Sequence, residues 1–272
     1  MTGPRRNEPA NASETGPRRN EPANAGEWGA LRIFEGLDEL SRAAADDLQT
    51  IARAAVAEYG SCSVALSGGS TPKRLFQLLA AMGPDALPWD HIELWWGDER
   101  AVPPDHADSN YRMAREALIE PLGLSADHIH RFRAELADHD AAAVSYELEL
   151  TGALGTPPVV DLVLLGMGPD GHTASLFPGS PALTEKRRFV VANSVDSPLT
   201  KGPTTRLTLT APAIKAARHT RFLIAGADKA DALAKVLEGP RNPTRYPSQL
   251  ITGTDLVWFL DRAAASQLGA KP

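Results

Sequence analysis

The chain has 272 residues and a formal net charge of −6, from 28 Lys and Arg against 34 Asp and Glu. Such a chain lacks the basic field that general nucleic-acid binding needs, so we expect no nucleic-acid partner, although a local cluster of cations could bind a small anion. Cys62 is the only cysteine, which excludes disulfides within the chain and metal sites built from several thiolates. No apolar run approaches the roughly 20 residues that span a bilayer, and we expect no membrane partner. The N-terminus also lacks the apolar core of a signal peptide, so we expect a cytoplasmic protein.

The first segment of the chain is a direct repeat. Thr2–Ala12 and Thr15–Ala25 both have the sequence TGPRRNEPANA, which offers almost nothing to bury and is too short and polar to stack as a solenoid. We predict a disordered tail over residues 1–27, with a regulatory or targeting role as the alternative. No Pro- or Ser-rich linker interrupts residues 28–272, which we predict to form a single α/β domain.

Short apolar runs then alternate with segments of helical periodicity. This alternation predicts an α/β fold with a mostly parallel open sheet, helices on both faces and right-handed crossovers. Helices are expected over Leu37–Tyr59, Pro72–Ala81, Tyr111–Leu118, Ala141–Leu150 and Lys229–Leu237. Strands are expected over Ser63–Leu66, Ile92–Trp96, Asp161–Leu165, Phe189–Ala192, Leu207–Leu209, Arg221–Ala225 and Leu256–Leu260.

Three unusual segments each follow an apolar strand directly. They are SGGSTP at Ser67–Pro72, GDER at Gly97–Arg100 and GMGPDGHT at Gly166–Thr173. In open parallel sheets, ligands bind outside the carboxyl ends of the strands. We therefore expect the three segments to meet at one edge of the sheet and to form a binding site there.

The first segment has the residue types that suit a phosphate. Gly68 and Gly69 allow the backbone to approach a ligand closely, and free amides at a helix N-terminus favour an anion. Ser70 and Thr71 add hydroxyl donors, and one of them is expected to cap the helix that Pro72 opens. A plain tight turn with a capped helix is the alternative. The segment is neither a P-loop nor a dinucleotide fingerprint, because the required lysine and third glycine are missing.

The second segment places a carboxylate and a guanidinium two residues apart. Asp98 and Arg100 share one side of an extended backbone. Together they could form a polar fork that holds sugar hydroxyls or orients a neighbouring imidazole. A solvated charge cluster at a loop is the alternative.

The third segment is the most informative of the three. Gly166, Gly168 and Gly171 surround Asp170 and His172. Glycines cost conformational entropy on folding, so this density indicates a backbone shaped around a ligand. Histidine titrates near neutral pH and is suited to removing a proton from water. A capping histidine in a Gly-rich turn is the alternative.

Two further sets of residues have the types that bind metals or anions. His128 and His130 could suggest a metal site, but no carboxylate or third histidine completes a recognisable pattern, so no metal is expected. Lys201 and Arg206 stand just before a predicted strand and suit the binding of a phosphate dianion. Surface charge is the alternative for this pair.

Taken together, these motifs resemble those of the 6-phosphogluconolactonase family. The matching stretches are ALSGGSTPKRLF, WWGDERAVPPDHADSNYRMA, DLVLLGMGPDGHTASLFPGS and RLTLTAPAI, in the family's order, and the similarity extends from about residue 30 to the C-terminus. The resemblance implies a Rossmann-like sheet shared with glucosamine-6-phosphate deaminases, with no metal and no other cofactor. It also implies hydrolysis of 6-phosphogluconolactone to 6-phosphogluconate, the second step of the oxidative pentose phosphate pathway.

The resemblance also implies roles for individual residues. By motif position, His172 would be the general base that activates water, and Asp98 and Arg100 would orient the base or bind substrate. Ser70, Thr71, Lys201 and Arg206 would hold the phosphate, with Asn110 as a neighbour. The candidate site therefore comprises the catalytic residues His172, Asp98, Arg100 and Asp170, and the substrate-binding residues Gly68, Gly69, Ser70, Thr71, Asn110, Gly168, Lys201 and Arg206. The expected partner is a small phosphorylated sugar lactone, and the expected assembly is a monomer.

Two other functions and one other mechanism compete with this interpretation. A glucosamine-6-phosphate deaminase or isomerase would carry a further acidic residue soon after the histidine, whereas Thr173–Pro178 contains none. A non-catalytic sugar-phosphate sensor would be expected to have a DNA-binding extension and to lose the Asp170 and His172 pair. A covalent acyl-enzyme mechanism is less favoured, because the chain has no G-x-S-x-G elbow.

Overall fold

The computed structural model describes residues 23–24, 28–200 and 202–269 of the chain. Nearly all of the predicted tail over residues 1–27 lies outside these ranges. Within it, Ala23–Asn24 form a two-residue strand, β1, which pairs antiparallel with β2 (Ala30–Phe34). No helix in the described part of the chain is long and apolar enough to cross a membrane.

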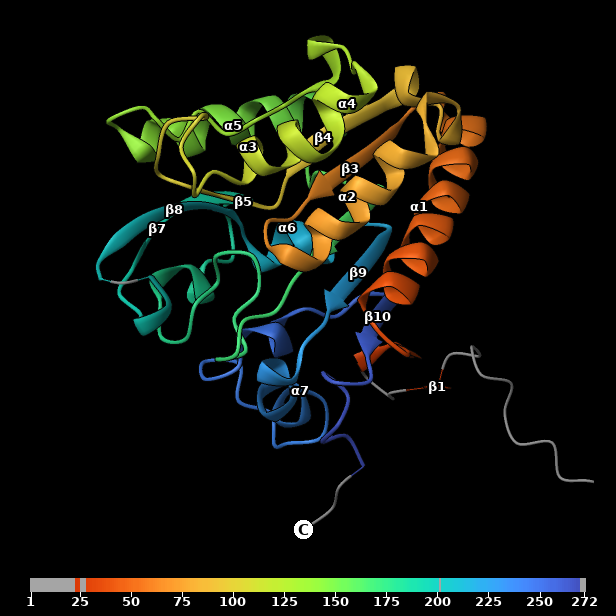
Figure 1. Cartoon of the computed structure of the whole chain (residues 1–272). Coiled ribbons are helices and arrows are strands. Elements are labelled where there is room, and N and C mark those ends of the chain that lie inside the picture. Colours follow the sequence, from red (N-terminus) through yellow and green to blue (C-terminus); the bar gives the residue numbers. More distant parts are fainter. Residues whose placement is uncertain (1–22, 25–27, 201, 270–272) are drawn as a thin grey trace, which may run out of the picture.

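The main sheet has seven strands in the order β1-β2-β10-β9-β6-β3-β4. Apart from the β1–β2 pair, all neighbouring strands in this sheet run parallel, as the sequence predicted (Figure 1). Its remaining strands are β3 (Cys62–Leu66), β4 (Ile92–Trp96), β6 (Leu162–Leu165), β9 (His219–Ile224) and β10 (Leu256–Asp261).

Helices cover both faces of this sheet, which confirms the predicted fold class. α1 and α2 lie side by side on one face (Figure 1) and pack with Leu66 and Leu94 around a small apolar cavity. Trp95 points to the opposite face, because successive side chains of a strand alternate, and there it contacts Tyr146 of α5. The helices are α1 (Leu37–Tyr59), α2 (Ser70–Met82), α3 (Asn110–Ala114), α4 (Glu120–Leu122), α5 (His139–Leu154), α6 (Ala211–Lys215) and α7 (Ala230–Leu237), with a π-helical turn at Arg115–Ile119.

The central strands and the long helix follow directly from the residue pattern. Every residue of β3 and β6 is buried, which is expected of parallel strands covered on both faces. The 23-residue helix α1 buries residues three or four positions apart, and it ends where Gly60 adopts a left-handed φ of 83°. β2 was not predicted. Its five residues lie next to the two-residue edge strand β1, and only Phe34 is buried, so the apolar signal is weak.

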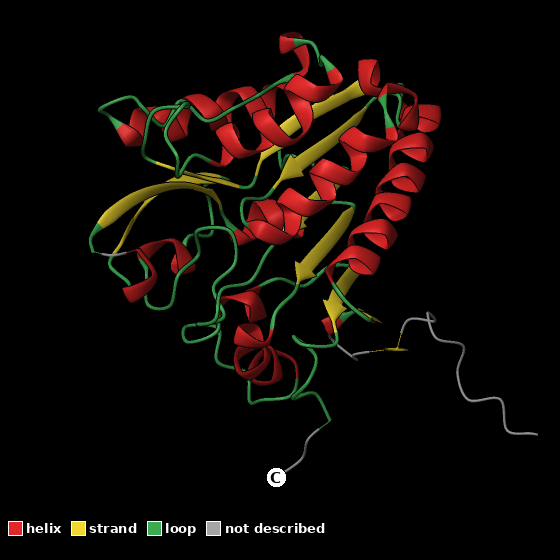
Figure 2. Ribbon diagram, viewed as in Figure 1, coloured by secondary structure: helices red, strands yellow, loops and turns green. Residues whose placement is uncertain are grey.

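A second, three-stranded antiparallel sheet has the order β5-β8-β7 (Figure 2). It consists of β5 (Asp98–Arg100), β8 (Thr204–Leu209) and β7 (Val190–Val195). The sequence predicted strands near β7 and β8 but placed them in the alternating pattern of a parallel sheet. That placement was wrong, because the connection from β7 to β8 is too short for the crossover that parallel neighbours require.

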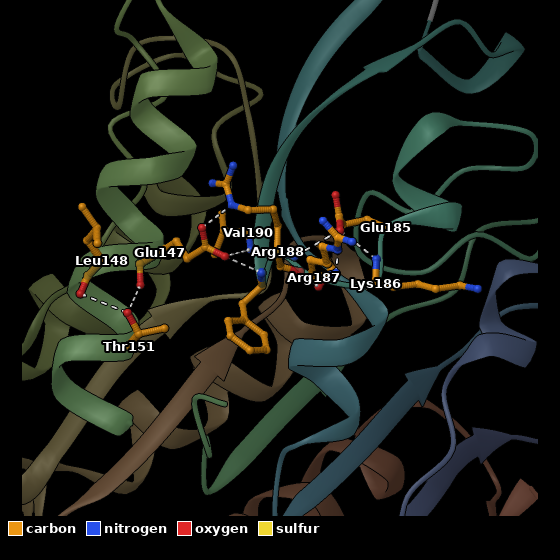
Figure 3. A network of polar contacts seen from close by, with 10 residues as sticks. Glu147, Leu148, Thr151, Glu185, Lys186, Arg187, Arg188 and Val190 are labelled. Carbon is orange, nitrogen blue, oxygen red and sulfur yellow. Dashed lines mark hydrogen bonds and ion pairs between the residues drawn. The ribbon is translucent and has the colours of Figure 1, made fainter. Parts of the chain in front are cut away.

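α5 holds the start of β7 in place through one carboxylate. Glu147 accepts hydrogen bonds from the backbone amides of Phe189 and Val190 and forms an ion pair with Arg188 (Figure 3). Just before them, the Glu185 carboxylate accepts the amides of the next three residues. The small sheet is therefore attached to the helix that covers β4.

Gly97 joins the two sheets. It is the single residue between β4 and β5. Its amide donates to the carbonyl of Leu66 on β3 over 2.9 Å, and its carbonyl accepts from the amide of Leu209 on β8 over 2.8 Å. One residue is thus hydrogen-bonded to both sheets.

Candidate active site

The three unusual segments meet in one cavity of about 320 Å³, lined by residues that follow β3, β4 and β6. The predicted convergence at the carboxyl ends of the parallel strands is therefore confirmed. Asp170 lies behind His172 and is not part of the cavity wall, and Lys201 falls outside the described residues. The predicted residues that line the cavity are Gly68, Gly69, Ser70, Thr71, Asp98, Arg100, Asn110, Gly168, His172 and Arg206.

The loop after β3 differs from the prediction in how helix α2 is capped. Gly69 is the N-cap residue, with φ of 104°, and no side chain caps the helix. The prediction that Ser70 or Thr71 is the cap was wrong, because the helix already begins at Ser70. Neither hydroxyl hydrogen-bonds to another described residue. The first-turn amides and both hydroxyls are therefore available to an anion at this helix N-terminus.

Asn110 connects the first segment to the second. A Cβ atom on Gly68 would lie 1.8 Å from the Oδ1 of Asn110, so only glycine permits this contact. The side-chain Nδ2 of Asn110 donates to the backbone carbonyl of Asp98 over 2.9 Å and to the Oδ1 of Asp98 over 3.2 Å. A substitution at position 68 would therefore displace the group that supports Asp98.

The predicted fork between Asp98 and Arg100 does not form. The carboxylate of Asp98 is buried and accepts hydrogen bonds from Ser175 Oγ, at 2.6 Å, and from Asn110. The guanidinium of Arg100 instead donates to the carbonyl of Asp108. Asp98 and Arg100 lie on the same side of β5, and both line the cavity, but their side chains hydrogen-bond to different partners.

The charge distribution near β8 favours an anion. Arg206 lies directly opposite Arg100 in the antiparallel register. Its Nε is buried without a hydrogen bond, and it forms no ion pair among the described residues. Burial, together with the neighbouring charge of Arg100, lowers the pKa of Arg206. Each guanidinium raises the free energy of the ionised form of the other. An anion between these two cations would therefore stabilise both of them.

Glu99 lies between the cavity residues Asp98 and Arg100 on β5, and its buried side chain supports the site from the protein interior. Its carboxylate accepts hydrogen bonds from Ser109 Oγ and from the amides of Asn110 and Tyr111, at the start of α3. Burial raises its pKa, although these hydrogen bonds oppose the shift. Glu99 thereby fixes the position of Asn110.

His172 and Asp170 form a dyad. The His172 Nδ1 lies 2.6 Å from Asp170 Oδ1, and the imidazole stacks on Phe177 with ring centroids 4.1 Å apart. Burial opposes ionisation of Asp170, but the hydrogen bonds and charge of His172 lower its pKa below the usual value. An ionised carboxylate accepts a hydrogen bond from the Nδ1–H group and so leaves Nε2 with its lone pair for a ligand in the cavity. The imidazole caps no helix.

The loop that carries this dyad is shaped by glycines. A Cβ on Gly168 would lie 2.1 Å from His172 Nδ1, so the backbone itself packs against the dyad. Gly171 has φ of 81°, and its carbonyl accepts hydrogen bonds from both the amide and the Oγ of Ser248, at 3.0 and 2.9 Å. Ala174, which lines the cavity, is the one described residue other than glycine with a positive φ.

Lys229 is a cavity residue that the sequence reasoning missed. It lies in the turn after β9 and forms an ion pair with Asp228 at 2.9 Å. The sequence did contain a signal for it. Like β3, β4 and β6, strand β9 is parallel, and it is followed by Gly226, with φ of 105°, and then by this lysine. Applying the strand-end rule to that strand would have found it.

No group of three or more His, Cys, Asp and Glu side chains in the described part of the chain is arranged to hold a metal. His128 and His130 instead both contact the carboxylate of Glu93, each at 2.9 Å. The two histidines, two positions apart in the sequence, are thus both bound to one carboxylate.

Residues 35–258 match the family described as Glucosamine-6-phosphate isomerases/6-phosphogluconolactonase. The chain belongs to this family. The resemblance inferred from the four sequence motifs is therefore confirmed.

Similar proteins of this family include several 6-phosphogluconolactonases. The chain is 43% identical to that of Synechocystis sp., over 79% of this chain and 88% of the relative. It is 40% identical to that of Mycobacterium tuberculosis, over 88% of this chain and 98% of the relative. The structure of the 6-phosphogluconolactonase from Trypanosoma brucei superposes with a TM-score of 0.78 at 30% identity, covering 88% of this chain and 98% of that one.

Proposed function

We propose that the chain hydrolyses 6-phosphogluconolactone to 6-phosphogluconate, with His172 as the general base. The observation that carries the proposal is the His172–Asp170 dyad, which opens into a cavity that is also lined by the cationic side chains of Arg100, Arg206 and Lys229. The names of its relatives support the same reaction. The substrate is a small phosphorylated sugar lactone.

In the proposed mechanism, water attacks the lactone carbonyl carbon while Nε2 of His172 removes one of its protons. Asp170 keeps the proton on Nδ1 and stabilises the imidazolium that forms. When the tetrahedral intermediate collapses, the bond from the carbonyl carbon to the ring oxygen breaks. The imidazolium then returns its proton to the departing ring oxygen, which becomes a hydroxyl, and the new carboxylic acid ionises.

The phosphate is assigned to the cationic groups and the helix N-terminus. Arg206, Lys229 and the first turn of α2, with the hydroxyl of Ser70, line the same cavity. A dianion there would be stabilised by charge-assisted hydrogen bonds and by the helix dipole. Anchoring this remote group supplies binding free energy that positions the reacting carbon. Arg100 completes the cationic side of the wall.

The deaminase alternative lacks a carboxylate. Among the described residues that line the cavity, Asp98 is the only acidic one, whereas an aldose–ketose proton shuttle was expected to need a further acid after His172. The presence of the dyad likewise disfavours the non-catalytic sensor. The monomeric state and the cytoplasmic location stay predictions.

The direct test of the function is proton release from freshly generated 6-phosphogluconolactone, with spontaneous ring opening subtracted. We expect the wild-type chain to accelerate hydrolysis strongly and to release no ammonia from glucosamine 6-phosphate. Ammonia release without lactone hydrolysis would replace the lactonase by the deaminase. If neither substrate reacted while the chain still bound a sugar phosphate, the sensor would be the correct interpretation.

Replacing Lys229 with alanine is expected to raise KM for the lactone by about 10- to 100-fold, because one charge-assisted hydrogen bond to the phosphate is lost. The inhibition constant of inorganic phosphate should rise in parallel. Steady-state kinetics with phosphate as a competitive inhibitor measures both.

The matched control is Lys235→Ala, because Lys235 lies on the adjoining helix α7 and does not line the cavity. Lys235 is about half exposed and pairs only with Asp231, so its loss should leave KM within about twofold. An unchanged KM in Lys229→Ala would remove this lysine from the phosphate site.

A further inference from the structure

Ser175 is a buried serine in the wall of the cavity, and the proposed mechanism does not use it. Its Oγ donates to Oδ2 of Asp98 over 2.6 Å, and the two residues are 1% and 8% exposed. The other carboxylate oxygen of Asp98 accepts from Asn110 at 3.2 Å. Each oxygen of this carboxylate therefore has one donor among the described residues.

The backbone of Ser175 is itself held by the small antiparallel sheet. Its amide donates to Thr208 Oγ1 over 3.2 Å, and its carbonyl accepts from Asn193 Nδ2 over 2.8 Å. Thr208 and Asn193 lie on β8 and β7 and are 0% and 1% exposed. Thr208 is also directly opposite Asp98 in the register. The hydroxyl and the carboxylate are thus fixed by the same sheet.

The hydrogen bond from Ser175 has a geometric consequence for the cavity. A carboxylate has about four lone-pair positions, and its terminal torsion is broad when nothing restrains it. Two fixed donors stop that rotation and leave one lone pair on each oxygen. Asp98 lines the same cavity as His172, so these lone pairs are available to a group bound beside the base.

We propose that Ser175 is a positioning residue for Asp98. It holds the carboxylate in the one orientation in which its free lone pairs accept a hydrogen bond from a substrate hydroxyl or from the attacking water. This inference rests on the proposed lactone hydrolysis. Ser175 acts through Asp98, because its hydroxyl donates its hydrogen bond to that carboxylate.

The test compares Ser175→Ala with Ser180→Ala. Ser180 is the matched control: it is buried, it accepts a hydrogen bond from the same Asn193 at 3.0 Å, and it does not line the cavity. We expect Ser175→Ala to lower kcat by about 10- to 100-fold, the range expected when a hydrogen bond to a charged group is lost. Ser180→Ala should stay within about twofold of the wild type.

Two readouts separate positioning from general damage. In Ser175→Ala, KM and the inhibition constant of inorganic phosphate should stay within about twofold, because the cationic groups assigned to the phosphate are not attached to this serine. In an Asp98→Ala background, Ser175→Ala should lower kcat by less than about twofold, because its target is gone.

Each contrary result has a distinct meaning. A wild-type chain without lactonase activity would overturn both the proposed function and this inference before any variant is made. An active wild type with equal kcat values for Ser175→Ala and Ser180→Ala would overturn the positioning role alone. So would a parallel loss of phosphate inhibition, or a full further loss of kcat in the Asp98→Ala background.

Discussion

Replacing His172 with alanine is expected to lower kcat for lactone hydrolysis by about 10²- to 10⁴-fold, the usual contribution of a general base. The reason is local. Nδ1 is committed to Asp170 at 2.6 Å, and Nε2 is the atom left to accept a proton from water in the cavity. Proton release at neutral pH, corrected for spontaneous opening, measures the effect, and thermal unfolding shows whether the fold is retained.

His91→Ala is the matched control for this experiment. His91 is exposed and lines a different cavity, near the start of β4, so its removal should leave kcat within about twofold. If His172→Ala kept full activity, the lactonase assignment would stand but the base would have to be another group. A loss of activity in both variants would point to a nonspecific effect of histidine removal.

Gly168→Ala is expected to lower kcat on the order of 10²-fold or more, although it replaces no titratable group. The added Cβ would lie 2.1 Å from His172 Nδ1 and 2.7 Å from Asp170 Oδ1, far inside van der Waals contact. Either the imidazole or the loop must move, and a displacement of about 1 Å from the reacting geometry is enough for a loss of this size. Steady-state kinetics at several pH values would show a lower kcat.

Gly152→Ala controls for the general effect of replacing a glycine. Gly152 lies in α5, and a Cβ there would meet nothing within 4 Å. We expect unchanged kcat and stability raised by up to about 1 kcal/mol, because alanine is favoured over glycine in a helix. Wild-type kcat in Gly168→Ala would contradict the idea that close packing of the loop backbone orients the dyad.

Much of the main sheet and of the cavity wall could be predicted, because both depend on local signals. Continuous apolar runs such as Leu162–Leu165 mark buried parallel strands, and the rule that ligands bind at strand ends then brings three segments together. The helix over Leu37–Tyr59 was predicted with its observed bounds, since its apolar spacing and its terminal glycine agree. The proposed function followed from the family resemblance that the motifs at that edge carry.

The features that were not predicted depend mostly on pairings between segments that are distant in the sequence. Which partner Asp98 binds is decided by Ser175, 77 positions away in the sequence, and no periodicity encodes that choice. The small antiparallel sheet was missed for a similar reason: β5 has three residues, and its register with β8 is a tertiary feature. Lys229 lay within reach of the strand-end rule, which was not applied to the fourth strand.

The single-residue joint at Gly97 has a consequence for how the site responds to its substrate. Because Gly97 is hydrogen-bonded to strands of both sheets, the dyad that follows β6 and the charged residues of β5 and β8 sit on one continuous hydrogen-bonded frame. Under the proposed mechanism, the dipoles and charges around the cavity would therefore be set before the lactone binds. Little reorganisation free energy would then be required during the proposed reaction.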